Sequence, residues 1–275
     1  MINLMYSGNY KMFDGMIISL LSIIKYTKQP LNVFVLTGDY VDLNPKFVGF
    51  DENQIKFLDD IVKKVNPQSR VQKIDLSNYH DMFAKSANVK SKYSIYSMMR
   101  LLADKLDLPD KILYLDTDVV AYHDITQLWD MDITNFELAI AKDYYGKVFL
   151  GPSYFNSGVM LINLAKVKET KLFEKAMQMC MDKKMLLPDQ SALNKYAKYK
   201  KYLPTRFNSQ KKLYPDTVFR HFSMTIKFLP KFHTINIKPW NVQMVHEKYK
   251  CYEFDDILGE YQVLLKKYKQ EFKYE

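Results

Sequence analysis

The stretch Lys111-Ile112-Leu113-Tyr114-Leu115-Asp116-Thr117-Asp118-Val119-Val120 joins a short apolar run to two acidic residues. The run from Ile112 to Leu115 is typical of a strand buried in a parallel sheet. Asp116 and Asp118 stand two positions apart, so their side chains are expected on the same side. Ligands of open α/β sheets bind at the carboxyl ends of strands. The pair could therefore hold a divalent cation, although for such a motif taken alone an ordinary Asp-rich turn is the favoured explanation.

Apolar strands and amphipathic helices alternate through the first half of the chain. Strands are expected at Ile2–Tyr6, Leu31–Leu36, Val71–Leu76 and Ile112–Leu115, and helices between them at Met16–Tyr26, Asn53–Val65 and Tyr93–Leu106. This alternation predicts an α/β fold with a parallel sheet of the nucleotide-binding type.

The pattern loosens in the second half of the chain. Further strands are expected at Phe136–Ala141 and Ser157–Leu164, and helices at Val167–Met181 and Asp189–Tyr199. Turns and short strands dominate from Arg206 onward. The last helix carries one apolar stripe, formed by Ile257, Tyr261, Leu264, Leu265, Tyr268 and Phe272.

Composition narrows the class of protein. The 275 residues are 48% hydrophobic, which is enough for a sizeable core, and there are only two cysteines, so neither a disulfide framework nor a zinc pattern is present. No signal-peptide layout and no apolar stretch long enough to span a bilayer is evident, so a soluble cytoplasmic protein is expected. The net charge of +9 fits phosphorylated substrates or an anionic membrane surface. No nucleic-acid-binding signature accompanies the lysines, which argues against a nucleic-acid partner.

Three later motifs each have a simple explanation when taken alone. Phe155-Asn156-Ser157-Gly158-Val159-Met160-Leu161-Ile162-Asn163 places an amide at the start of a buried strand. Pro188-Asp189-Gln190 could be a helix N-cap, and Lys238-Pro239-Trp240 a turn around a buried tryptophan. Arg206-Phe207-Asn208 carries no information by itself.

Together, and in this order behind the Asp-Thr-Asp motif, these segments resemble the family 8 glycosyltransferases, relatives of glycogenin and of the bacterial lipooligosaccharide galactosyltransferases. The resemblance runs from Asn9-Tyr10 to Trp240. It implies a GT-A fold, a Rossmann-like mixed and mainly parallel sheet flanked by helices, over residues 1–242, with a basic helical extension over 243–275. It also implies a retaining, metal-dependent hexosyltransferase of cell-surface polysaccharide biosynthesis. Such an enzyme moves glucose or galactose from a UDP-sugar to a glycan or lipid-linked acceptor.

The resemblance implies a metal site for Mn²⁺ or Mg²⁺. Asp116 and Asp118 are its expected carboxylate ligands. A histidine completes such sites, and two candidates stay open. His221 is followed by an aromatic residue, as in the family, but lies farther from Lys238 than usual. His233 has closer to the usual spacing but lacks the aromatic residue. We favour His221 and interpret Met224–Asn236 as an insertion.

Further roles also follow from the resemblance alone. Asn9, Tyr10 and Thr117 would contact the donor nucleotide, and Arg100 and Lys238 its phosphates. The transferred sugar would be held by Asp143, Asn156, Asp189 and Gln190, with Gln190 nearest the reacting face. No carboxylate stands out as a nucleophile, so front-face attack within an ion pair is the preferred mechanism.

Alternatives remain at the level of sequence. Ser7-Gly8 stands where the family commonly has an acidic residue that reads uracil, which makes UDP less certain. Leu115–Val120 also mimics the nucleophile strand of a haloacid-dehalogenase-like phosphatase, and a non-catalytic relative that binds nucleotide-sugars or glycans is a further possibility. Finally, lysines beside the last helix could contact the inner face of the cell membrane: Lys248, Lys250, Lys266, Lys267, Lys269 and Lys273.

Overall fold

The computed structural model of the protein describes residues 1–91, 95–227, 231 and 233–272. Tyr93, the expected start of one helix, and Lys273 lie outside the described residues, as does part of the segment interpreted as an insertion. Among the described residues, no helix combines the length and the apolar character needed to cross a membrane.

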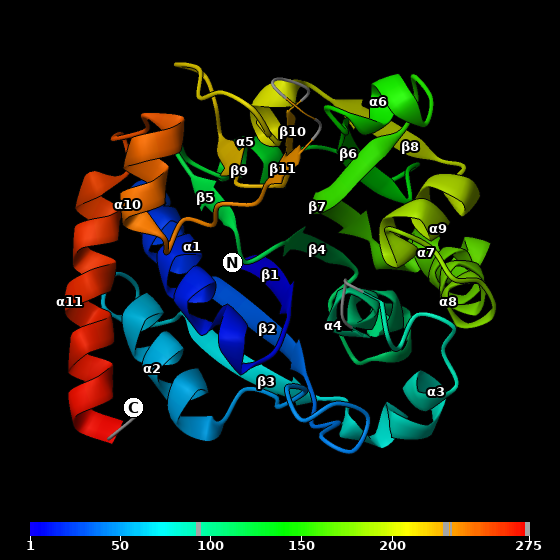
Figure 1. The fold of residues 1–275 in the computed structure, drawn as a ribbon, viewed down its shortest axis with the longest axis horizontal. Helices are drawn as coiled ribbons and strands as arrows, with labels where there is room; N and C mark the ends of the chain where they lie inside the picture. The colour runs from blue at the N-terminus through cyan, green and yellow to red at the C-terminus, as the bar shows by residue number, and fades with distance from the viewer. Residues whose placement is uncertain (92–94, 228–230, 232, 273–275) are drawn as a thin grey trace.

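A seven-stranded sheet forms the centre of the molecule, in the order β3-β2-β1-β4-β7-β6-β8 (Figure 1). Its strands are β1 Ile2–Ser7, β2 Leu31–Thr37, β3 Arg70–Asp75, β4 Lys111–Leu115, β6 Leu138–Lys142, β7 Phe155–Asn163 and β8 Lys200–Leu203. The first four strands are parallel, as predicted, and β6 is parallel to β8. Strand β7 is antiparallel to both of its neighbours, so the sheet is mixed and mainly parallel.

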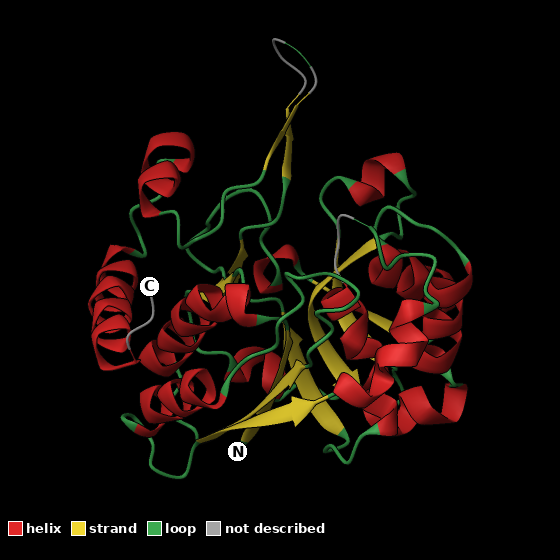
Figure 2. Cartoon of the chain, turned by 60° about the horizontal axis from the view of Figure 1, so that its bottom comes forward, coloured by secondary structure: helices red, strands yellow, loops and turns green. Residues whose placement is uncertain are grey.

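Helices cover both faces of this sheet (Figure 2). On one face, α1 Phe13–Tyr26, α2 Glu52–Lys63 and α11 Asp255–Phe272 share one hydrophobic core with the sheet. The other face is covered by α4 Ile95–Met98, the 3₁₀ helix η3 Met99–Lys105, α7 Leu164–Thr170, α8 Leu172–Asp182 and α9 Pro188–Tyr196. The strands alternate between the two cores. In β4, Leu113 and Leu115 face the first core and Ile112 and Tyr114 the second.

Two expected helices differ from the prediction. The described part of the helix expected over Tyr93–Leu106 is a short α-helix, α4, that continues as the 3₁₀ helix η3, a frequent change near helix ends. The helix expected over Val167–Met181 is broken at Lys171, whose φ of 56° ends α7 with a left-handed cap before α8 begins. The apolar period continues across this break, because Val167 and Phe173 still enter the same core. Periodicity alone could therefore not reveal it.

Helix α11 lies along α1 and α2 at the edge of the molecule (Figure 1). Four residues of its predicted apolar stripe are buried there, and Leu265 and Phe272 are half-buried against the same core. The Tyr268 ring packs 4.7 Å from Phe13 and 5.0 Å from Phe57, measured between ring centroids. The stripe is thus used inside the protein. Contact between this helix and a membrane would have to rest on its exposed lysines.

Two small antiparallel pairs lie outside the main sheet. Strand β5 Val119–Ala121 pairs with β9 Phe219–His221, and the register sets Val119 opposite His221. Strands β10 Thr225–Lys227 and β11 His233–Ile235 form a hairpin that projects from the body of the protein (Figure 2). The remaining short elements are η1 Tyr10–Met12, η2 Ser77–Tyr79, α3 His80–Ala84, α5 Thr126–Trp129, α6 Gly146–Phe149, η4 Thr205–Phe207, α10 Val242–Met244 and the π-helical turn η5 Val245–Tyr249.

Candidate active site

The Asp-Thr-Asp motif directly follows β4 and is held between β7 and β9. The backbone N–H of Asp116 donates to the carbonyl of Gly158 at 2.8 Å. The β5–β9 pairing then brings His221 next to the motif. Ligand atoms of Asp116, Asp118 and His221 all lie within 4.8 Å of one another. His221 Nε2 is 3.2 Å from Asp118 Oδ1 and 3.9 Å from Asp116 Oδ2.

The two candidate histidines have different surroundings. His221 is buried beside the carboxylates, whereas His233 is exposed on the projecting hairpin, where its Nδ1 lies 2.8 Å from the carbonyl of Lys231. The residues interpreted as an insertion, as far as they are described, form this hairpin. That these residues are an insertion, which would account for the long spacing between His221 and Lys238, stays a prediction.

Asn208 determines which nitrogen of His221 carries the proton. The Gly158 N–H donates to Asn156 Oδ1 at 3.0 Å, and the same oxygen accepts from Asn208 Nδ2 at 2.9 Å. The Asn208 oxygen therefore faces His221 Nδ1, at 3.1 Å, and must accept a proton from it. The lone pair of a neutral His221 is then on Nε2, which points to the two aspartates. Such outer hydrogen bonds orient metal-ligating histidines.

Gly158 is required by the close packing at this point. A Cβ atom at this position would lie 2.3 Å from His221 Cε1 and 2.8 Å from Asp116 Oδ2. Any larger residue would displace at least one of these two side chains. The glycine of the Phe155–Asn163 motif thus serves the carboxylate–histidine cluster rather than the strand.

Arg100 lies beneath the motif and is buried. Its Nη2 donates to Asp116 Oδ1 at 2.8 Å, its Nη1 donates to the Ser157 carbonyl at 2.9 Å, and its guanidinium lies 4.0 Å from the centre of the Tyr114 ring. Burial acts to lower the pKa of Arg100, but the neighbouring carboxylates outweigh it and raise that pKa. Arg100 is therefore a buried partner of the Asp-Thr-Asp motif and not part of a surface salt bridge.

Tyr114 and Ser7 extend this network. Tyr114 donates its hydroxyl proton to Asp116 Oδ1 at 2.8 Å, and Ser7 Oγ lies 3.0 Å from the same hydroxyl. Burial raises the pKa of Tyr114 well above its ordinary value, so it stays a donor. Ser7, at the position where the family commonly has an acidic residue, is thus linked to Asp116 through Tyr114.

Lys238 closes the site on the side of Asp118. Its Nζ donates to Asp118 Oδ2 and, at 3.3 Å, to the carbonyl of Phe222. Burial would raise the pKa of Asp118, but the neighbouring Lys238 and His221 side chains hold that pKa below its ordinary range. Asp118 therefore stays an anion although it is buried.

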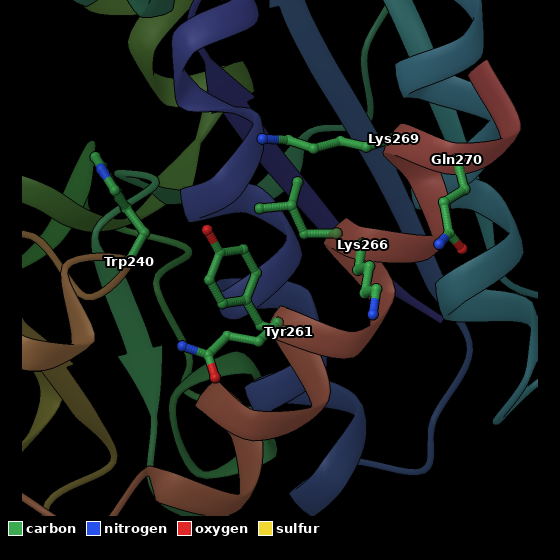
Figure 3. A pocket seen from close by; sticks show the side chains of 7 residues that line it. Trp240, Tyr261, Lys266, Lys269 and Gln270 are labelled. Atoms are coloured by element: carbon green, nitrogen blue, oxygen red, sulfur yellow. The ribbon is translucent and has the colours of Figure 1, made fainter. Parts of the chain in front are cut away.

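Trp240, two residues after Lys238, packs between the Asp-Thr-Asp loop and helix α1. It packs against Gly15 of α1, where a Cβ atom would lie 2.7 Å from the indole and 2.5 Å from the Thr117 carbonyl oxygen. Trp240 also borders a hollow whose opposite side is formed by Tyr261, Lys266 and Lys269 of α11 (Figure 3). The Lys238-Pro239-Trp240 segment thus joins the motif loop to α1.

A cluster of polar side chains lies beside the motif. Asn156 Nδ2 donates to Asp143 Oδ2 at 3.0 Å, and Gln190 Nε2 donates to the same oxygen at 3.3 Å. The amide oxygen of Gln190 accepts from the Ser157 N–H at 3.1 Å, which fixes the orientation of its side chain. The other oxygen of Asp143 accepts from the N–H groups of Tyr145 and Gly146, at 3.0 and 2.6 Å. Both carboxylate oxygens of Asp143 are therefore fixed by hydrogen bonds, one set from the backbone and the other from Asn156 and Gln190.

Asp189 connects this cluster to Arg100. It follows Pro188, the first residue of α9, and the N-cap of that helix is Leu187, so Asp189 is not the capping residue. Its Oδ2 lies 3.5 Å from Arg100 Nε. Burial raises the pKa of Asp189, although the charge of Arg100 partly opposes this.

Asn9, Tyr10 and Thr117 lie toward the first strand. Asn9 is buried and donates from Nδ2 to the Lys46 carbonyl at 3.1 Å, while Tyr10 is half-buried. The hydroxyl of Thr117 lies 3.4 Å from the sulfur of Met12, which ties the short helix η1 to the motif. Among the described residues, the side chains of Asn9 and Tyr10 make no hydrogen bond to Asp116, Asp118 or His221.

Sequence reasoning missed Asn208, Tyr114 and Ser157. Tyr114 stands inside the apolar run and Ser157 inside the strand motif, so both looked like ordinary strand residues. Asn208 had no recognisable pattern around it. Only its position between Asn156 and His221 shows what it does.

Residues 1–244 match the profile described as "Glycosyl transferase family 8", and this chain belongs to that family. The curated relatives include a putative glycosyltransferase of Haemophilus influenzae, 26% identical over 75% of this chain and 62% of its own length. They also include a lipopolysaccharide 1,2-glucosyltransferase of Escherichia coli, 31% identical over 52% of this chain and 48% of its own length. The chain spans less than two thirds of the length of these relatives. The family match replaces the phosphatase interpretation of Leu115–Val120.

Solved structures agree on the fold. The galactosyltransferase LgtC, in complex with donor and acceptor sugar analogues, aligns with a TM-score of 0.67 and 19% identity, covering 94% of this chain and 96% of its own. GlyE of Streptococcus pneumoniae aligns with a TM-score of 0.66, covering 94% of this chain and 63% of its own. Together with the mixed sheet, these likenesses confirm the predicted GT-A fold.

Proposed function

We propose that this protein transfers a glucosyl or galactosyl group from a UDP-sugar to a glycan or lipid-linked acceptor, with retention of the anomeric configuration and with Mn²⁺ or Mg²⁺. The observation that carries this proposal is the convergence of Asp116, Asp118 and His221 on one point. Lys238 and Arg100 flank that point, and the Asn156–Asp143–Gln190 cluster lies beside it.

The three candidate ligands suit a divalent cation. Carboxylate oxygens and a neutral imidazole nitrogen are donors that Mn²⁺ accepts, and Mg²⁺ prefers the oxygens. Asn208 keeps the lone pair of His221 on the nitrogen nearest both carboxylates. A bound cation would neutralise the diphosphate of the donor. The donor set of this chain therefore fits the group that the family implies.

The two cations of the site divide the electrostatic work. Transfer builds positive charge on the sugar and negative charge on the departing diphosphate. Lys238, half-buried on Asp118, is placed to hold that negative charge, and preorganised cations are effective in this role. Arg100 keeps its two bonds to Asp116 and the Ser157 carbonyl, and so positions the carboxylate.

The state of the carboxylates in and beside the Asn156–Asp143–Gln190 cluster favours front-face attack over a covalent intermediate. Both oxygens of Asp143 already accept hydrogen bonds, and Asp189 is buried against Arg100. Neither is a free nucleophile. Gln190, held by the Ser157 N–H, would contact the sugar at its reacting face. In this mechanism the leaving phosphate takes the proton of the acceptor hydroxyl. Asp143, Asn156 and Asp189 would hold the sugar.

Recognition of the base would rest on the first strand. We propose that Asn9 and Tyr10 contact the nucleotide, with the Tyr10 ring stacking on the base and Thr117 contacting it from the motif. Ser7 carries a hydroxyl and not a carboxylate, and that hydroxyl lies 3.0 Å from the Tyr114 hydroxyl. Backbone groups around residues 8–10 would then read the base.

The test is release of UDP from UDP-glucose and UDP-galactose, with Mn²⁺, with Mg²⁺ and with chelator. The variant Asp118→Asn removes one ligand charge. Asp107→Asn is the matched control, because Asp107 is exposed and precedes β4, whereas the Asp-Thr-Asp motif follows the other end of that strand. We expect metal-dependent release from one of the two sugars. It should fall by at least about a hundredfold in Asp118→Asn and stay within twofold of wild type in Asp107→Asn.

Two other results would count against this function. Release that ignores chelator and both substitutions would contradict a metal-dependent transferase. Binding of a nucleotide-sugar without turnover would favour the non-catalytic relative. The division into residues 1–242 and 243–275, a cytoplasmic location and peripheral membrane contact through the lysines of α11 stay predictions.

A further inference from the structure

A second hollow, of about 220 Å³, lies between the end of β6, helix α6 and the loop that follows η4. Lysine is the most frequent residue type in its lining, and no acidic residue among those the structure describes takes part. The residues on which the argument depends are Lys142, Tyr144, Lys147, Lys211, Lys212 and Tyr214. None of them belongs to the carboxylate–histidine cluster or to the residues around Lys238.

The floor of this lysine hollow is a built structure. Gln210 is buried, and its amide oxygen accepts from the Tyr144 N–H at 2.9 Å while its Nε2 donates to the Lys142 carbonyl at 3.1 Å. Ser209, also buried, donates its hydroxyl to the carbonyl of Lys212. The bonds of Gln210 join the end of β6 to the loop that follows η4, and the Ser209 bond fixes that loop. The two lysine-bearing segments are thereby held together.

Within the described part of the chain, the positive charges of the hollow have no carboxylate partner. Among the described residues, none of its four lysines has an Asp or Glu within ion-pair distance. Lys211 Nζ instead donates to the Tyr144 hydroxyl at 2.8 Å, and Lys147 Nζ lies 5.4 Å from the centre of that ring. The pKa of Tyr144 is lowered, first by the hydrogen bond from Lys211 and then by the nearby lysine charges. A concave group of like charges of this kind attracts an anion.

Two chain segments connect the hollow directly to the Asn156–Asp143–Gln190 cluster and to Asn208. Asp143 stands between Lys142 and Tyr144, and neighbouring Cα atoms are about 3.8 Å apart. Gln210 follows two residues after Asn208, which contacts His221 and Asn156. A ligand bound in the hollow would thus adjoin the place where the acceptor hydroxyl must meet the sugar.

We propose that this hollow binds a phosphate group of the acceptor, so that the acceptor is a phosphorylated glycan or polyol rather than a neutral sugar. The proposal rests on the proposed function and names the substrate class for the same site. The phosphate can be carried by a soluble molecule or by a lipid. A lipid carrier is tested as well, because Val148, Phe149 and Leu150 beside the hollow are 69%, 57% and 62% exposed.

The test is calorimetric titration with glycerol 3-phosphate, and with glycerol as the neutral match. It is run with and without UDP and Mn²⁺, so that the diphosphate site is filled in one arm. The variant Lys147→Glu with Lys211→Glu reverses two charges of the hollow. Lys266→Glu with Lys269→Glu on α11 makes the same charge change at the other hollow and serves as the control.

We expect glycerol 3-phosphate to bind the wild type in both arms and glycerol not to bind. The first variant should weaken binding about a hundredfold, roughly tenfold for each lysine lost, and the control should stay within threefold of wild type. Lys147→Gln with Lys211→Gln gives the same test with no charge reversal. Equal binding of glycerol and its phosphate, or equal weakening in variant and control, would overturn the proposal.

Vesicles separate the two sources of phosphate. Sedimentation with phosphatidylcholine vesicles, with and without phosphatidylglycerol, shows whether a lipid headgroup is bound through the same lysines. Binding of these vesicles that disappears in Lys147→Glu with Lys211→Glu identifies a lipid-linked phosphate, and binding of the soluble probe alone identifies a soluble one. Loss of UDP release with intact phosphate binding would reject the transfer reaction and leave the anion site standing. The reverse result would reject the anion site alone.

Discussion

Substitution of Gly158 tests whether the carboxylate–histidine cluster is a metal site. The Cβ of Gly158→Ala would lie 2.3 Å from His221 Cε1, whereas carbon atoms in contact are about 3.5–4.0 Å apart. The imidazole must therefore retreat by roughly 1 Å or more. Metal–ligand distances tolerate only about 0.2 Å, so His221 Nε2 would leave the point that it shares with Asp116 and Asp118.

We expect Mn²⁺ to bind Gly158→Ala at least about 10–100-fold more weakly, the loss seen when the support of a metal ligand is disturbed. Overpacking should also cost about 1–3 kcal/mol of stability, or a melting temperature lower by about 2–4 °C for each kcal/mol. Calorimetric titration with Mn²⁺ and thermal unfolding with and without the ion measure both effects.

Gly259→Ala is the matched control. Gly259 lies within α11 and a Cβ there would meet no atom within 4 Å. An alanine in a helix is favoured over glycine by up to about 1 kcal/mol, so this variant should be slightly more stable and bind Mn²⁺ as the wild type does. Wild-type affinity for Mn²⁺ in Gly158→Ala would refute the assignment of His221 as a ligand.

Substitutions at three further positions probe other contacts. Asn208→Ala frees the His221 ring to change tautomer and should weaken Mn²⁺ binding about tenfold or more, measured by calorimetry. Asn208→Asp keeps the acceptor oxygen and should therefore recover part of the affinity. Gly15→Ala places a Cβ 2.5 Å from the Thr117 carbonyl oxygen and should lower the melting temperature by several degrees, for a cost of about 1–3 kcal/mol; an unchanged value would show that α1 can shift freely. Burial raises the pKa of Asp104, so its contribution to stability is present below its unfolded-state pKa and is lost as the pH rises through the folded-state value. Asp104→Asn should therefore raise stability at pH 7 by about 0.5–1 kcal/mol and by less near pH 3 in denaturant titrations, and an equal effect at both pH values would contradict this origin.

Local patterns were enough to place the main elements of the sheet. The apolar runs at β1, β2 and β4 are continuous because parallel strands are buried on both faces, and this feature is visible in a few neighbouring residues. The Asp-Thr-Asp motif was likewise legible, because its two carboxylates and the strand before them are consecutive in sequence. The apolar stripe of α11 followed from helical periodicity alone.

Relations between distant segments were decided by the tertiary structure. The periodicity of apolar residues does not reveal the direction of β7, which runs antiparallel to its neighbours β4 and β6. The left-handed break at Lys171 is hidden because the apolar period continues across it. These features depend on packing between segments far apart in sequence.

The completed site shows the same division. The residue types at Asp116, Asp118, Asn156 and Lys238 indicated a site for a cation and a phosphorylated ligand. The sequence left two candidates, His221 and His233, for the third metal ligand. Pairing of β5 with β9 brings His221 to the aspartates, while the hairpin holds His233 at the surface. Asn208 acquires its role only where the chain passes between His221 and the strand motif. Sequence therefore determined the kind of chemistry, because side-chain type is local, and folding decided which residues share it, because ligand sets are assembled across space.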